Sequence, residues 1–89
     1  MPKMDSLEIV LYPLITEDTV KLIEAENKIT FIVDQRASKR EITDAVEELY
    51  EVEVDKVNTC NTARGRKKAY VKLTPEYTAA DLAAKLGIL

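Results

Sequence analysis

The sequence contains no histidine, no tryptophan and a single cysteine, Cys60, among its 89 residues. One cysteine cannot form a disulfide within the chain, and one thiol cannot supply the ligands of a tetrahedral zinc site. Without histidine, the Ser–His and Cys–His pairs that activate nucleophiles are also excluded. We therefore expect no metal, no cofactor and no enzymatic activity. An unpaired thiol favours a reducing compartment, so we expect the protein in the cytoplasm.

Glycine and proline are scarce, with two and three residues, and the chain lacks a Gly-rich phosphate-binding loop. The longest apolar run, residues 9–12, is far shorter than the roughly 20 residues that a membrane-spanning helix needs. No apolar segment of the signal-peptide type follows the first six residues. We therefore expect no membrane insertion and no secretory signal. A chain of this length with 46% hydrophobic residues predicts one folded domain, spanning residues 1–89.

Charge of one sign is missing from two long segments, although the whole chain carries a net charge of only −3. Residues 41–55 contain seven acids and no base, whereas residues 56–72 contain six bases and no acid. Salt at about 0.15 M screens charge interactions beyond roughly 8 Å, so we expect the two blocks to act as separate surfaces. The acidic total therefore does not argue against a nucleic-acid partner.

The hydrophobic pattern predicts four strands and three helices. We expect strands over residues 7–12, 28–34, 56–62 and 67–73, and helices over 17–25, behind the cap at residues 38–41 within the acidic block, and from 78. The strands at 28–34 and 56–62 form a split β-α-β unit with the helix between them, and the last two strands form a hairpin. This order predicts an α+β fold, with a four-stranded, mainly antiparallel sheet covered by helices, related to the ferredoxin-like fold.

Helix caps support these assignments. Ser38 with Glu41, and Thr78 with Asp81, have the spacing of capping boxes, and Thr16 is a suitable cap for the first helix. The main helix has the clearest apolar stripe, which consists of Ile42, Ala45, Val46, Leu49 and Tyr50. Its outer face carries Asp44, Glu47, Glu48 and Glu51, and Val52 and Val54 are expected to pack the following connection.

The basic hairpin is the strongest candidate site, because phosphate groups are bound by cations, with amides and hydroxyls fixing the register. Gly65 supplies the positive φ of its turn, and Tyr70 offers a ring on which a base can stack. Lysines and arginines before the main helix form a second basic cluster. The candidate RNA-binding residues are Arg36, Lys39, Arg40, Lys56, Asn58, Thr59, Asn61, Thr62, Arg64, Arg66, Lys67, Lys68 and Tyr70. The alternative is that these charges serve only solubility and protection of a sheet edge.

Other reactive groups have simpler explanations. The carboxylate pairs Glu17/Asp18 and Glu47/Glu48 lie on helix faces that we expect to be solvated, whereas catalytic carboxylates work in enclosed pockets. Cys60 has no partner base, and its neighbours in the strand favour simple packing. These residues give no indication of an enzyme.

Four motifs, in order from Val10 to Leu73, resemble universal large-subunit ribosomal protein twenty-three. Residues 13–17 (PLITE) are similar to the opening P-x-x-[TS]-E, and residues 37–47 to A-[ST]-K-x-E-I-x-x-A-V-E. Residues 54–59 match V-x-x-V-N-T, and residues 67–73 match K-K-A-Y-V-x-L. The short hairpin at residues 64–66 is typical of archaeal members, because bacterial members insert a long extension there.

The resemblance implies a protein bound to large-subunit rRNA beside the exit of the polypeptide tunnel, next to another ribosomal protein. It implies rRNA contacts at the motif positions Lys39, Asn58, Thr59, Lys67, Lys68 and Tyr70. It also implies that Glu17, with Asp18 beside it, faces a docked signal recognition particle or nascent-chain chaperone. Asp18 departs from the family, which usually has lysine there, so an RNA contact is not expected at that position.

Two other functions remain open from the residues alone. One is a free-standing interaction module that binds a basic protein through the acidic helix 41–55. The other is a small acylphosphatase-like enzyme of similar fold, although the sequence offers no glycine-rich phosphate cradle for it.

Overall fold

Four helices and four strands make up the chain in a computed structural model, which describes residues 5–87. In chain order they are α1 Ser6–Ile9, β1 Val10–Pro13, α2 Glu17–Glu26, β2 Lys28–Val33, α3 Lys39–Tyr50, β3 Val54–Asn61, β4 Lys67–Leu73 and α4 Ala79–Lys85. The first four positions of the segment tested for a signal, and the last two of the predicted domain 1–89, lie outside the described residues.

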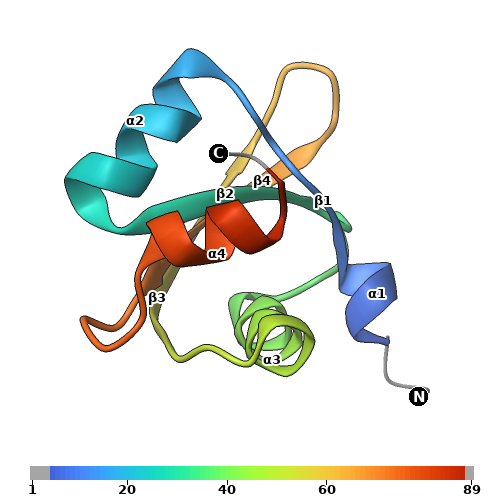
Figure 1. Cartoon of the computed structure of the whole chain (residues 1–89). Helices are drawn as coiled ribbons and strands as arrows, with labels where there is room; N and C mark the ends of the chain where they lie inside the picture. Colours follow the sequence, from blue (N-terminus) through green and yellow to red (C-terminus); the bar gives the residue numbers. More distant parts are fainter. Residues whose placement is uncertain (1–4, 88–89) are drawn as a thin grey trace.

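The four strands form one antiparallel sheet in the order β1-β2-β4-β3 (Figure 1). Since β2 and β3 both run antiparallel to β4 between them, they are parallel to each other, and α3 connects them. This arrangement confirms the predicted split β-α-β unit and the α+β fold class. The hairpin β3–β4 is confirmed as well, and β4 has the predicted bounds.

The hydrophobic core lies on one side of the sheet. Phe31 of β2 and Ala69 and Val71 of β4 are fully buried there, because alternate residues of a strand face the same side. Ile42 and Val46 of α3 cover them, as do Ala79, Leu82 and Ala83 of α4. The apolar stripe predicted for the main helix is therefore confirmed, and Leu49, Tyr50 and Leu86 pack at the margin of the core.

Capping fixes where the helices begin. Ser38 Oγ accepts from Glu41 N at 3.2 Å, and Glu41 Oε1 accepts from Ser38 N at 3.0 Å, which completes the predicted capping box. At α4, Thr78 Oγ1 accepts from Asp81 N at 3.2 Å. The reciprocal bond of the second predicted box is missing from the described contacts of Asp81, whose side chain is one methylene shorter than that of glutamate.

The expected strand 7–12 is wrong in its first half. Residues 6–9 form the short helix α1, in which the Asp5 carbonyl oxygen accepts from Glu8 N and Ile9 N. Ser6 Oγ donates to Glu48 Oε2 at 2.7 Å, which ties this turn to α3. The strand begins only at Val10 and includes Pro13, as an edge strand allows at its end.

The acidic block 41–55 is not one helix. The helix ends at Tyr50, because Glu51 adopts the left-handed conformation with φ 54°, and β3 begins at Val54. Carboxylates on the outer face of α3 also have more partners within the protein than expected. Glu47 Oε2 accepts from Val54 N at 2.9 Å, and Glu48 Oε2 accepts from Ser6 Oγ. Two of its carboxylates therefore stabilise the fold.

Candidate functional site

The side of the sheet opposite the core carries polar and basic side chains. Strand alternation places Lys56 and Asn58 of β3, and Lys68 and Tyr70 of β4, on this open face. Asn58 pairs directly with Tyr70 across the two strands. The structure thus brings together four residues that were predicted to bind RNA.

The sequence analysis overlooked two more lysines of the open face. Lys28 of β2 and Lys72 of β4 are cross-strand neighbours, and Lys72 also pairs with Lys56. The alternation of Lys68, Tyr70 and Lys72 along β4 was a sufficient signal for Lys72. Lys28 lies 3.4 Å from Glu26, so its charge is partly balanced.

The hairpin between β3 and β4 turns tightly at its tip. Thr62 N donates to the Arg66 carbonyl oxygen at 2.7 Å, Arg66 N donates to Thr62 Oγ1 at 3.1 Å, and Gly65 has the predicted positive φ of 78°. Arg64 and Arg66 are both exposed at this tip. Arg66 Nη1 donates to Tyr12 Oη at 2.8 Å, so the guanidinium is held against the edge strand β1.

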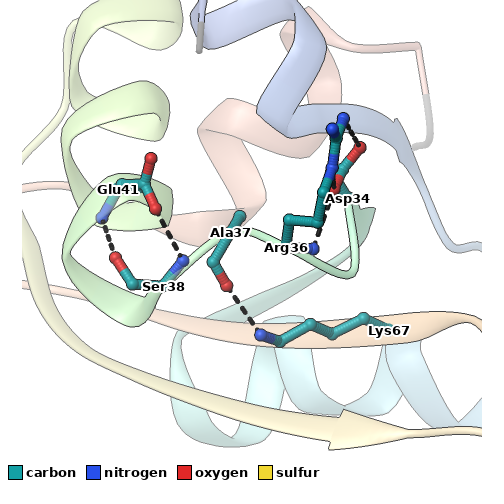
Figure 2. Close-up of polar contacts among 6 residues, drawn as sticks. All are labelled: Asp34, Arg36, Ala37, Ser38, Glu41 and Lys67. Carbon is teal, nitrogen blue, oxygen red and sulfur yellow. Dashed lines mark hydrogen bonds and ion pairs between the residues drawn. The ribbon is translucent and has the colours of Figure 1, made fainter. Parts of the chain in front are cut away.

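The basic residues predicted before α3 differ in whether they have an acidic partner. Arg36 is paired with Asp34, with Nε 3.1 Å from Oδ1 and Nη2 3.2 Å from Oδ2 (Figure 2). These hydrogen bonds lower the pKa of Asp34 and raise that of Arg36. Lys39 and Arg40 are exposed in the first turn of α3, where their charges oppose the positive end of the helix dipole.

Three other predicted residues lie on the side of the sheet that the helices cover. Thr59, Asn61 and Lys67 alternate with the open-face residues, and Asn61 pairs with Lys67 across the strands. Lys67 Nζ donates to the Ala37 carbonyl oxygen at 2.6 Å (Figure 2). This contact joins β4 to the loop before α3, and it gives Lys67 a structural role that the sequence does not indicate.

Few of the cations of the site are matched by carboxylates. Between residues 5 and 87, ion pairs form at Lys21, Lys28 and Arg36. Lys56, Arg64, Arg66 and Lys68 therefore remain without a carboxylate partner in that range, and their charge is available to an external anion.

The expected packing of Cys60 is wrong. It lies on the open face opposite Lys68, and its thiol is exposed, because the core is on the other side of β3. Within the described part of the chain, no group of three or more His, Cys, Asp or Glu side chains could hold a metal ion. The same residues include no helix long and apolar enough to cross a membrane.

The acidic residues expected at a docking surface lie in the first turn of α2. Thr16 caps this helix as predicted, and Glu17 and Asp18 are exposed, with Glu17 Oε1 3.6 Å from Lys21 Nζ. Ile15, directly before the cap, is 57% exposed. The first turn of α2 and the residue before its cap thus present two carboxylates and one apolar side chain to solvent.

Comparison with known proteins fits this arrangement of motifs and faces. The family model of ribosomal protein L23 matches residues 8–80. The chain belongs to the ribosomal protein L23 family. It is 49% identical over 85 residues to the large ribosomal subunit protein uL23 of Methanococcus aeolicus, which covers 96% of this chain and 99% of the relative. The resemblance seen in the sequence is thereby confirmed, including its archaeal type.

The family assignment gives the motif residues a structural context. The V-x-x-V-N-T motif forms β3, the K-K-A-Y-V-x-L motif forms β4, and the two are neighbouring strands. The A-[ST]-K-x-E-I motif is the cap and first turn of α3. The motifs of the L23 family therefore include the start of α3 and the hairpin strands β3 and β4, with residues of the open face.

Proposed function

We propose that this protein is a structural component of the large ribosomal subunit that binds rRNA through the open face and the hairpin tip. The observation that carries the proposal is a set of cations that have no carboxylate partner among residues 5–87, beside Asn58 and Tyr70. They are Lys56, Lys68, Arg64 and Arg66. Cations bind phosphates, whereas the amide and the ring bind sugar and base groups.

The first turn of α3 supports the same proposal. Lys39 and Arg40 stand where the helix dipole favours acids, so their placement does not serve the stability of α3. Residues that break a local rule of stability are characteristic of functional sites. Lys39 and Arg40 therefore extend the rRNA-binding surface to the loop before α3. Arg36, Thr59, Asn61 and Lys67 stay at the margin of this surface, because Arg36 and Lys67 have partners within the protein and Thr59 and Asn61 lie on the side of the sheet that the helices cover.

The acidic first turn of α2 defines a second, protein-binding role. Glu17 and Asp18 with Ile15 form the surface on which a signal recognition particle or a nascent-chain chaperone would dock. This role requires a position beside the polypeptide exit tunnel, next to a neighbouring large-subunit ribosomal protein. The protein acts there as a binding platform in the cytoplasm and not as an enzyme, and its hairpin is too short to carry a tunnel extension.

The rRNA proposal is tested by the salt dependence of binding. Lys68→Gln should weaken binding of the full chain to protein-free large-subunit rRNA, and should reduce the slope of log K against log salt by about 0.7–0.9. Lys85→Gln, at the exposed end of α4, is the charge-matched control and should leave both quantities unchanged. Equal effects of the two variants would mean that binding depends only on the total charge of the protein, and would overturn the assignment of this site.

A further inference from the structure

Exposed large apolar side chains are confined to one segment of the described chain. They are Leu7, Leu11, Tyr12 and Ile15, which lie in α1, in β1 and directly before the cap of α2. Leu11 is 50% exposed and Tyr12 is 41% exposed, although both belong to β1. These two side chains border a groove that the proposed rRNA site does not yet include.

The groove has a volume of about 560 Å³, within the range of pockets that hold small ligands. Leu11 and Tyr12 form one wall, and Gly65 and Arg66 of the hairpin tip form another. Ile32 contributes to an apolar floor. The groove is thus a slot between the edge strand and the basic hairpin, with an aromatic ring on one side.

Polar groups at the rim are placed to orient a ligand. Arg66 is fixed beside the ring by its 2.8 Å hydrogen bond to Tyr12 Oη. Gln35 also lines the groove, and its Nε2 lies at van der Waals distance, 3.4 Å, from the point where a Cβ on Gly65 would be. The Gln35 amide beside the hairpin tip can both donate and accept hydrogen bonds.

A second hollow continues from the first. It has a volume of about 360 Å³, shares Ile32 and Arg66 with the groove, and is also lined by Arg64 and Lys68. Among the described residues, every charged side chain that lines it is basic, and the rest of its lining is apolar or carries hydroxyls, as at Leu14, Ala63 and Thr62. An aromatic slot that opens into a hollow with three cations matches one nucleotide, with its base in the groove and its phosphates in the hollow.

We propose that the groove between Tyr12 and Arg66 binds one unstacked base of rRNA, which stacks on the Tyr12 ring while Arg66, Arg64 and Lys68 hold the adjoining phosphates. The inference rests on the proposed function and extends it to the edge strand. The three cations of the hollow favour a nucleotide over an apolar side chain of a neighbouring protein, because an apolar side chain offers them no negative charge.

The test compares variants of Tyr12 in binding of the full chain to protein-free large-subunit rRNA. Tyr12→Ala should weaken binding between about 5-fold and 150-fold, as expected for loss of one base–aromatic stack. Tyr12→Phe should bind within about 3-fold of the wild type, because the ring remains. Tyr12→Ala should leave the salt slope unchanged, since no charge is removed.

Controls distinguish failure of the base-binding groove from failure of the proposed rRNA binding. Leu7→Ala removes another exposed apolar side chain of the same segment, outside the groove, and should bind normally. Ultraviolet crosslinking of the wild type should join Tyr12 to a single nucleotide. If Tyr12→Ala binds rRNA normally, or loses only a neighbouring ribosomal protein, the base-binding groove is overturned while the proposed function stands. If the wild type itself fails to bind rRNA, the proposed function is overturned instead.

Discussion

The ammonium group of Lys67 donates a 2.6 Å hydrogen bond to the carbonyl oxygen of Ala37, 30 residues away in the sequence. Ala37 is buried, and the bond fixes the loop that leads into α3 onto the sheet. Lys67 and Lys68 are adjacent motif positions, and an RNA contact is predicted for each. The structure places their side chains on opposite sides of the sheet, because neighbouring residues of a strand face opposite sides.

Lys67→Met should lower the free energy of unfolding by about 1–2 kcal/mol, because it keeps the aliphatic stem but leaves the Ala37 carbonyl without its charged donor. Denaturant unfolding measures this difference. Lys68→Met, on the open face, is the matched control and should change stability by less than about 0.5 kcal/mol. A similar loss in both variants would show that the contact with Ala37 contributes nothing specific.

Asn27 should be among the most sensitive positions outside the core. Its Nδ2 donates to the carbonyl oxygens of Leu73 at 3.2 Å and Tyr77 at 2.9 Å, and its Oδ1 accepts from Ala79 N at 2.6 Å. The residue is also left-handed, with φ 55°. Asn27→Ala should destabilise the protein by about 2–4 kcal/mol, since it removes these bonds and strains the backbone.

Asn27→Gly separates the two causes, because glycine accepts the left-handed conformation without strain. It should recover about 1 kcal/mol of the loss seen in Asn27→Ala and leave the hydrogen-bond contribution missing. Thermal and denaturant unfolding of both variants measure how much of the destabilisation comes from backbone strain and how much from the lost hydrogen bonds. Full recovery by glycine would mean that the side-chain bonds are energetically neutral.

Tyr50 should make stability depend on alkaline pH. Its ring stacks on Phe31 with centroids 5.6 Å apart, and burial raises its pKa above the usual 10.0. The unfolded chain therefore releases this proton at a lower pH than the folded protein. The corresponding stability is complete below about pH 10 and is lost as the pH rises beyond it.

Tyr50→Phe keeps the stacked ring and removes the titrating hydroxyl. Between pH 8 and pH 11 the wild type should lose more free energy of unfolding than the variant, and the difference between the two losses isolates Tyr50. Parallel curves for the two proteins would contradict the effect assigned to burial.

Glu17→Gln should weaken docking of a signal recognition particle or chaperone on reconstituted large subunits by about 5-fold, the size of one exposed charge contact. The fold should tolerate the change, because the ion pair with Lys21 is exposed and contributes little. Glu24→Gln, an exposed acid later in α2, is the control. Co-sedimentation with subunits gives the affinity, and unchanged docking of the Glu17 variant would remove this surface from the proposed platform.

Much of the fold could be predicted because its signals are local. The Ser38–Glu41 capping box and the stripe from Ile42 to Tyr50 identified α3, and alternation identified β4 with its exact bounds. The helical turn at residues 6–9 was missed, because a short apolar run does not distinguish a strand from a helical turn. Its hydrogen bond to Glu48 comes from a segment about forty residues away.

The sequence alone determined the order of the elements, the opposition of an acidic and a basic block, and the motifs of the L23 family. Periodicity, capping and charge are properties of neighbouring residues, so they can be read before folding. Only the tertiary structure decided which cations have partners within the protein. Lys67 and Arg36 have internal partners, Lys68 and Arg64 have none among residues 5–87, and Arg66 meets Tyr12 from 54 residues away. Such contacts depend on strand pairing and loop closure, which cannot be inferred from the spacing of neighbouring residues.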